Sequence, residues 1–342
     1  MNVRSLYFIR PGQVAIREES LPGPGADQVA VRTGLSAISS GTEMLVYRGQ
    51  FPEGLPVDAS ITSLSGGFAY PLKYGYAAVG RVIETGSQAG AEWIGRRVFA
   101  FQPHTSGFIA RVEELIPIPD DIDDEDAVFL ANMETAVNLL LDGAPLIGER
   151  VVVFGQGIVG LLTAALLALC PLESLITLDR FERRRRASLE LGATASLDPT
   201  LPDISVRVLG ASGGTGEGSG VDLIYELSGS PAALDQAIGV TGFGGRVIIG
   251  SWYGKKRAPI DLGGRFHRSR IRLISSQVST LAPELSGRWS KQRRLDVAWK
   301  MLRRIKPSQL ITHRSPIAGA AEAYRLLAEA PEEAIQVLFT YE

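Results

Sequence analysis

The chain of 342 residues contains one cysteine, Cys170, and three histidines, His104, His267 and His313. A single cysteine excludes an internal disulfide, and so few soft ligands argue against a cysteine- or histidine-rich metal cluster. The net charge is −2, which offers no general electrostatic attraction to nucleic acid or to an anionic membrane. We therefore expect neither a nucleic-acid-binding protein nor a membrane-surface protein.

The sequence also lacks an apolar run of the ~20 residues that a membrane span needs. The longest run, 158–172, is interrupted by Gly160 and Pro171, and we interpret it as a buried helix. The N-terminal segment MNVRSLYFIRPGQV is too polar for a signal peptide, so we expect a cytoplasmic protein.

What is present is typical of a soluble globular protein, with 45% apolar and 21% charged residues. The length exceeds one ordinary core, so we expect two domains. Residues 1–120 carry short alternating runs punctuated by glycine and proline, which predicts a small β-barrel or sandwich. Its clearest strands are predicted at 28–32, 78–83 and 97–101.

In the second half of the chain, from 151 to 275, strands alternate with helical segments, which predicts an α/β domain with a parallel sheet. Its strands are predicted at 151–154, 175–178, 221–227, 247–250 and 271–275, and an amphipathic helix at 295–305.

Three other segments have a distinctive composition. The acidic run 120–126 precedes an apolar segment, and acids complement the dipole at a helix start, so we interpret the run as the beginning of a helix. The segments 50–73 and 215–220 are rich in small and turn-forming residues and are predicted as loops.

A glycine turn joins the first two strands of the α/β part. It follows a buried strand, opens a helix, and is followed about 20 residues later by an acid, Asp179, as a dinucleotide fingerprint requires. Such glycines permit the tight turn, the approach of a pyrophosphate and close helix packing. The alternative is a purely structural turn. The predicted cofactor-binding residues here are Gly155, Gln156, Gly157, Ile158, Val159 and Gly160.

The residues after the second strand bear on the choice of cofactor. Asp179 would accept hydrogen bonds from the adenine ribose and repel a 2′-phosphate, which favours NAD. Arg180 and the run 183–186 point the other way, because arginine is a natural partner of a 2′-phosphate. Neighbouring residues of a helix face different directions, so most of these arginines face solvent. We expect NAD, with NADP as the alternative.

Several motifs together resemble the medium-chain dehydrogenase/reductase superfamily, nearly from end to end. They are 28–49, 74–82 (YGYAAVGRV), 179–194 (DRFERRRRASLELGAT) and 221–230 (VDLIYELSGS). The resemblance implies a GroES-like β domain, residues 1–125 completed by 306–342, and a Rossmann domain over 126–305. It also implies a homodimer formed through an edge strand, here 271–276.

The resemblance adds four residues to the predicted cofactor site. It implies that Thr135 contacts the nicotinamide end, that Arg184 packs near the adenine, and that Ser228 lines a ribose. Gly250 ends the matching later strand. Some family members place a basic residue for the pyrophosphate near the C-terminus, where this chain has the uncharged Gln336.

The strongest departure from the family lies at its catalytic zinc. The zinc-binding Cys, the His-Glu pair and the second Cys correspond to Ser40, Tyr76 with Ala77, and Ala131. A catalytic zinc needs ~3 ligands of the Cys, His or carboxylate type. We therefore predict that the protein holds no zinc.

Without a metal, another group must polarise the substrate oxygen or supply a proton. Tyr76 replaces the metal-binding His, and its phenol can donate a proton, although filling the void left by the metal is an equal alternative. Thr42 stands at the family's proton-relay hydroxyl, and Glu43 matches an acid that is mostly structural in zinc enzymes. His104 lies in a loop after a strand, with a structural or surface role as the alternative.

The loop 39–43 (SSGTE) is similar to the branch that contains the bacteriochlorophyllide hydroxyethyl dehydrogenases. The resemblance implies a zinc-independent oxidoreductase that moves a hydride between NAD(P) and a small alcohol or carbonyl substrate. A zinc-free quinone or enoyl-type C=C reductase and a non-catalytic nucleotide-binding protein are the alternatives. The loop and its Thr42 favour the first.

Overall fold

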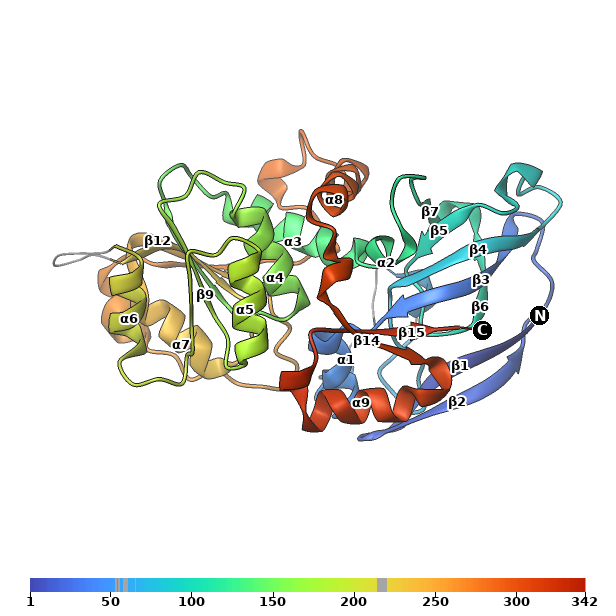
Figure 1. Ribbon diagram of the computed structural model, residues 1–342, viewed down its shortest axis with the longest axis horizontal. Helices are drawn as coiled ribbons and strands as arrows, with labels where there is room; N and C mark the ends of the chain where they lie inside the picture. Colours follow the sequence, from blue (N-terminus) through green and yellow to red (C-terminus); the bar gives the residue numbers. More distant parts are fainter. Residues whose placement is uncertain (53, 55, 58–60, 65, 214–219, 342) are drawn as a thin grey trace. The chain divides into compact units, whose positions relative to one another are not determined.

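The computed structural model describes residues 1–52, 54, 56–57, 61–64, 66–213 and 220–341. The chain divides into two compact units, which we call unit 1 (Met1–Ala131 with Leu302–Glu342) and unit 2 (Asn132–Met301) (Figure 1). No helix within the described ranges has the length and apolar character that crossing a membrane requires. The loop predicted over 215–220 lies outside these ranges except for Gly220.

Unit 2 is built on six parallel strands in the order β10-β9-β8-β11-β12-β13. The chain starts at the centre with β8, adds strands on one side, and then crosses to the other at β11, as in a doubly wound Rossmann sheet. The strands are β8 (Arg150–Phe154), β9 (Ser174–Leu178), β10 (Ala195–Leu197), β11 (Val221–Glu226), β12 (Thr241–Ile249) and β13 (Arg272–Ser275). The predicted α/β fold with a parallel sheet is confirmed, and β10 is a strand that the sequence analysis missed.

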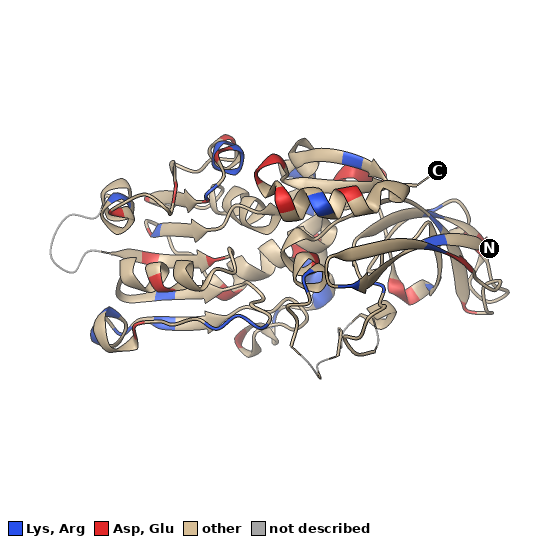
Figure 2. Cartoon of the chain, turned by 90° about the horizontal axis from the view of Figure 1, so that it is seen from below, with Lys and Arg blue, Asp and Glu red and all other residues tan. Residues whose placement is uncertain are grey.

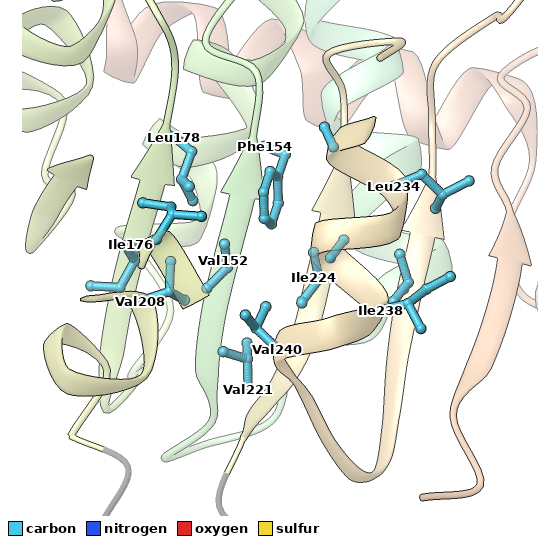
Figure 3. Close-up of a cluster of buried hydrophobic side chains, with 14 of the residues drawn as sticks. Val152, Phe154, Ile176, Leu178, Val208, Val221, Ile224, Leu234, Ile238 and Val240 are labelled. Carbon is cyan, nitrogen blue, oxygen red and sulfur yellow. The ribbon is translucent and has the colours of Figure 1, made fainter. Parts of the chain in front are cut away.

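Both faces of this sheet are covered by helices. Successive residues of a strand point to opposite faces, so Val152 and Phe154 pack with α6 and α7 (Figure 3), whereas Val151 and Val153 pack with α3 and α4. The helices are α3 (Leu130–Gly143, which begins in unit 1), α4 (Ile158–Leu167), α5 (Glu182–Glu190), α6 (Ile204–Ala211), α7 (Pro231–Val240) and α8 (Lys291–Ile305, which ends in unit 1). Burial on both faces explains why the strands are almost continuously apolar.

Unit 1 contains a seven-stranded sheet, in the order β14-β15-β3-β4-β5-β7 with β6 also paired to β3, and a separate β1–β2 hairpin. The C-terminal strand β15 pairs antiparallel with β3, for example Leu338 with Ala37, so the two ends of the chain build one sheet. The strands are β1 (Asn2–Arg10), β2 (Gln13–Ser20), β3 (Gln28–Ala37), β4 (Ala78–Thr85), β5 (Arg97–Ala100), β6 (Gly107–Arg111), β7 (Leu115–Pro117), β14 (Ile311–Pro316) and β15 (Gln336–Thr340).

Three further helices belong to unit 1: α1 (Ser40–Tyr47), α2 (Asp124–Ala127) and α9 (Ala320–Glu329). The core of the large sheet is formed by alternate strand residues such as Val29, Val82 and Phe108. In the view of Figure 2, basic and acidic segments are interspersed over both units, in line with the small net charge.

The acidic run 120–126 begins α2, as predicted, but its residues do more than complement a helix dipole. Asp123, at the N-cap, makes no side-chain capping bond. The neighbouring carboxylates instead form ion pairs with arginines from other parts of unit 1: Asp124 with Arg97 at 2.7 Å, Glu125 with Arg314 at 2.7 Å and Asp121 with Arg303 at 2.6 Å. Hydrogen bonding to Arg314 lowers the pKa of Glu125. The run therefore fastens α2 to β5, β14 and the end of α8.

Candidate cofactor site and hydroxyl cluster

Two glycines of the predicted fingerprint are required by packing. Gly155 has φ +88°, and a Cβ there would lie 2.6 Å from Ser228 Cα. A Cβ on Gly160 would lie 1.9 Å from the carbonyl oxygen of Gly155. Any other residue would therefore force the backbone of the turn apart.

Gly157 differs from both. Its φ of −68° is open to any residue, and a Cβ there would meet nothing within 4 Å. It is the N-cap of α4, and no side chain in the described ranges caps this end of the helix. The start of α4, with the N–H groups of Ile158 and Val159, thus has no side-chain cap and has open space beside Gly157, which is an arrangement that suits a pyrophosphate.

Asp179, at the end of β9, braces the same turn. Its side chain is 8% exposed, and its carboxylate accepts the N–H of Gln156 at 2.7 Å and that of Phe181 at 2.9 Å. Each oxygen keeps a further lone pair for a ribose hydroxyl. The Gln156 side chain points inward, since its amide donates to the carbonyls of Val153 and Gly155. The Gln156 side chain is therefore turned away from a cofactor contact.

The arginines after Asp179 separate into different roles. Arg185 donates to the carbonyls of Asp179 and Arg180, at 2.9 and 2.8 Å, and is therefore structural. Arg180 and Arg184 lie over the ring of Phe181, at 5.4 and 4.9 Å from its centroid. The guanidinium groups of Arg180 and Arg184 thus lie around Phe181, two residues after Asp179.

A buried carboxylate that the sequence analysis missed organises the end of β11. Glu226 is 0% exposed, and one oxygen accepts the N–H groups of Ser228 and Gly229 and the Ser228 hydroxyl. Its other oxygen accepts the Tyr253 hydroxyl at 2.8 Å. Burial, assisted by Glu226, raises the pKa of Tyr253. The Ser228 hydroxyl is therefore engaged with Glu226, and an acid ending a buried apolar strand was the available signal.

The two remaining predicted residues of unit 2 lie on neighbouring elements. Gly250 follows β12 and donates its N–H to the carbonyl of Glu226 at 3.1 Å. A Cβ there would lie 2.5 Å from Leu139 Cδ2, so a larger residue would require this leucine side chain to shift. Thr135 lies on α3 and is half-buried.

In unit 1, the structure brings together two of the predicted catalytic residues. The Tyr76 phenol donates to Thr42 Oγ1 at 3.3 Å and forms a short hydrogen bond with the hydroxyl of Ser39. Ser39 is the N-cap of α1 but makes no side-chain capping bond, which at such a position typically contributes ~1 kcal/mol. We call Ser39, Thr42 and Tyr76 the hydroxyl cluster. Its Ser39 was missed by the sequence analysis.

The other two predicted catalytic residues, Glu43 and His104, form a separate buried network behind this cluster. Both side chains are 0% exposed, and Glu43 Oε2 lies 3.0 Å from His104 Nε2. Glu43 Oε2 also accepts the Tyr324 hydroxyl, whereas Glu43 Oε1 accepts the N–H of Ser39 at 2.7 Å. Burial, together with the Glu43 carboxylate, raises the pKa of Tyr324. The burial of His104 favours the structural alternative for this residue.

The residues at the family's zinc positions do not fit a zinc ion. Ala77 and Ala131 are buried and offer no donor atom, and the Tyr76 phenol belongs to the hydroxyl cluster. Nowhere in the described ranges do three His, Cys, Asp or Glu side chains gather closely enough to hold a metal. Gln336, at the position of the family's basic residue, is buried and donates to the carbonyls of Ile38 and Val337.

The fold and the glycine turn define a two-unit protein with a Rossmann-type nucleotide-binding unit. The family model described as zinc-binding dehydrogenase matches residues 159–292. D-guloside 3-dehydrogenase of Escherichia coli K12 is 23% identical over 92% of this chain and 93% of that protein. The 2-desacetyl-2-hydroxyethyl bacteriochlorophyllide A dehydrogenase of Cereibacter sphaeroides is 25% identical over 95% and 94%.

A solved structure, the short chain alcohol dehydrogenase rspB of Escherichia coli CFT073 with its cofactor NADH, covers 99% of both chains with a TM-score of 0.78 and 20% identity. The chain is thus similar to zinc-type alcohol dehydrogenase-like proteins of the medium-chain dehydrogenase/reductase superfamily. The predicted resemblance, including the one to the bacteriochlorophyllide branch, is confirmed.

Proposed function

We propose that this protein is an NAD(P)-dependent oxidoreductase that interconverts an alcohol and a carbonyl group of a small molecule without zinc. The observation that carries the proposal is the open N-terminus of α4 at Gly157, braced by Asp179. The named relatives are dehydrogenases, and the rspB structure holds NADH.

The chain's own residues fit a nicotinamide dinucleotide. The N–H groups at the start of α4 would hold the pyrophosphate, and the free lone pairs of Asp179 would hold the adenine ribose. When bound, the cofactor supplies or accepts the hydride. The chain must then move the proton, and the Tyr76 phenol, bonded to Ser39 and Thr42, is the group that we propose for the substrate oxygen.

Replacing Tyr76 by Phe tests this role. General acid–base catalysis contributes about 10²–10⁴-fold, so Tyr76→Phe is expected to lower kcat by that factor with little change in cofactor affinity. Tyr70→Phe is the matched control, because the Tyr70 hydroxyl donates to the carbonyl of Val46 and takes no part in the hydroxyl cluster. An unchanged kcat in Tyr76→Phe would exclude proton transfer by this phenol.

We propose NAD as the preferred cofactor, because the Asp179 carboxylate repels a 2′-phosphate. Asp179→Asn keeps an oxygen for the Gln156 N–H but removes the charge, and leaves Arg180 and Arg184 in place. We expect the ratio of kcat/KM for NADPH to that for NADH to rise at least about tenfold, or about 1.4 kcal/mol. The same ratio measured in Arg180→Ala should move the opposite way, and a constant ratio in both variants would contradict the assignment.

The zinc-free proposal is tested by elemental analysis of the purified protein. Stoichiometric zinc would overturn it, whereas turnover that persists after chelation would support it.

Screening ketones, quinones and enones with saturating NADH separates the reaction types. Turnover of enones or quinones alone would favour a C=C reductase, and tight NADH binding without any turnover would favour a non-catalytic protein.

We also propose a cytoplasmic homodimer formed through β13. This strand is the edge of the sheet in unit 2 and pairs with β12 alone among the described strands. An edge strand presents unpaired backbone groups that can pair with a second chain. Sedimentation that gives the mass of a monomer would contradict the dimer.

A further inference from the structure

Glu43 is the centre of a buried hydrogen-bond network in unit 1. Its carboxylate is 0% exposed and receives three hydrogen bonds. The Ser39 N–H binds Oε1 at 2.7 Å, whereas His104 Nε2 and the Tyr324 hydroxyl both bind Oε2. A carboxylate held in this way can only act through its neighbours.

The partners behind Glu43 come from distant parts of unit 1. His104 lies between β5 and β6, and Tyr324 lies on α9. His104 Nδ1 is itself held by the hydroxyl of Ser36 at 2.7 Å, and the same hydroxyl is 2.7 Å from the Tyr341 hydroxyl. Tyr324 is enclosed by the rings of Tyr47 and Phe8. The orientation of the carboxylate is therefore fixed from several sides.

On the side of the hydroxyl cluster, the Glu43 carboxylate accepts the backbone N–H of Ser39. Ser39 is an N-cap serine whose hydroxyl does not cap its helix. That hydroxyl is bonded to the Tyr76 phenol instead. The residue thus has its backbone tied to Glu43 and its side chain tied to Tyr76.

We propose that Glu43 is a positioning residue, which holds Ser39 so that the serine hydroxyl orients the Tyr76 phenol, with His104 and Tyr324 fixing the carboxylate. The inference rests on the proposed role of Tyr76 and deepens it. Glu43 and His104, both predicted as catalytic candidates, then support a third candidate, Tyr76. Positioning at this level matters, because a displacement of about 1 Å can cost about 100-fold in rate.

The kinetic test is a double-mutant cycle between Glu43 and Tyr76. Glu43→Ala is expected to lower kcat about 10- to 100-fold while KM stays within about threefold. Glu43→Gln should recover part of this loss, because its amide oxygen can still accept the Ser39 N–H. In the Tyr76→Phe background, Glu43→Ala should cause no further loss. Additive losses would show a merely structural role and would overturn the proposal.

Asp126→Ala is the matched control for loss of stability. Asp126 is also a buried carboxylate of unit 1, and it also accepts one backbone N–H, that of Ser308, at 2.7 Å. Its loss should lower the melting temperature without lowering kcat. If Glu43→Ala fails to fold, Ser39→Ala replaces it, since this change removes no capping bond and should reproduce the fall in kcat.

Hydrogen–deuterium exchange of the segment 38–42 tests the positioning without any substrate. Glu43→Ala should accelerate exchange of this segment at least about tenfold, whereas Glu43→Gln and Asp126→Ala should not. Unchanged protection in Glu43→Ala overturns the proposal, whatever the enzyme's reaction is. If Glu43→Ala loses protection but Tyr76→Phe keeps an unchanged kcat, the anchoring of Ser39 by Glu43 stands. The proposed role of Tyr76 in proton transfer, and with it any effect of this anchoring on catalysis, would then be refuted.

Discussion

Gly157→Leu is expected to abolish cofactor binding while the protein stays folded. The backbone at Gly157 suits any residue, and the space beyond its Cα is open, so the new side chain would clash with no described atom near its Cβ. It would instead fill the space in front of the α4 N-terminus, where the pyrophosphate has to approach. We expect the dissociation constant for NADH to rise at least about 100-fold, or about 2.7 kcal/mol. Fluorescence titration with NADH measures this change.

Gly160→Ala provides the contrasting variant. Its Cβ would lie 1.9 Å from the Gly155 carbonyl oxygen and 2.9 Å from the carbonyl carbon, and neither backbone atom can move without opening the turn. Overpacking of this kind typically costs about 1–3 kcal/mol and sometimes more. Thermal unfolding should therefore distinguish the two glycines, with a loss of stability at Gly160 only. Normal NADH binding by Gly157→Leu would show that the dinucleotide does not use this turn.

The sheet of unit 2 could be predicted because each of its central strands is apolar on both faces. β8 and β11 lie at the centre, where two layers of helices leave no exposed position. β10 escaped prediction because it is a short edge strand of three half-buried residues, Ala195–Leu197, which gives neither a continuous apolar run nor a clear alternation.

The glycine turn and Asp179 were also predictable, because one short stretch of chain contains the whole motif. The support around Tyr76 was not. Ser39, His104 and Tyr324 are distant in sequence and meet only because β15 returns to pair with β3 and α9 packs beneath α1. A single sequence shows the residue types but not this long-range juxtaposition.

The burial of Glu43 and His104 could not be predicted from the sequence either. The sequence analysis named both as catalytic candidates, and both do lie near the hydroxyl cluster, but only the structure shows that they face the interior. Whether a titratable group faces solvent or the core depends on packing that the local sequence does not encode.

Arg294→Met is expected to produce the largest loss of stability in unit 2. Arg294 is 1% exposed and its guanidinium is fully engaged: it donates to Glu134 Oε1 at 2.9 and 3.1 Å, to Asn138 Oδ1 at 2.6 Å and to the carbonyl of Val278 at 2.5 Å. Asn138 continues the network to Asp142 and Ser276. These bonds join α3 to α8 and to the segment after β13.

Removing one partner of a buried ion pair typically costs about 3–5 kcal/mol, because the other charge stays in the interior without compensation. Here the remaining charge would be Glu134, which is 3% exposed. Arg186→Met is the matched control, since Arg186 pairs with Glu182 on the surface, at side-chain exposures of 73% and 64%. We expect that control to change the free energy of unfolding by less than about 1 kcal/mol. Urea denaturation of both variants measures the difference.

The loss in Arg294→Met should depend on pH in a defined direction. Burial raises the pKa of Glu134 above its ordinary 4.5, and Arg294 opposes this rise. Between the unfolded and the folded pKa the native state binds more protons than the unfolded state, so stability falls as pH rises through that interval. Without Arg294 the folded-state pKa of Glu134 rises further, so the pH interval between the unfolded and the folded pKa becomes wider. The loss of unfolding free energy in Arg294→Met should therefore be largest at neutral pH. It should shrink as the solution is acidified, because Glu134 then takes up a proton. Adding Glu134→Gln to Arg294→Met should remove most of this pH dependence, because Asp142, whose pKa burial also raises, is then the ionisable group left in the network. A deficit that stays constant with pH would mean that lost packing, rather than the stranded carboxylate, causes the instability.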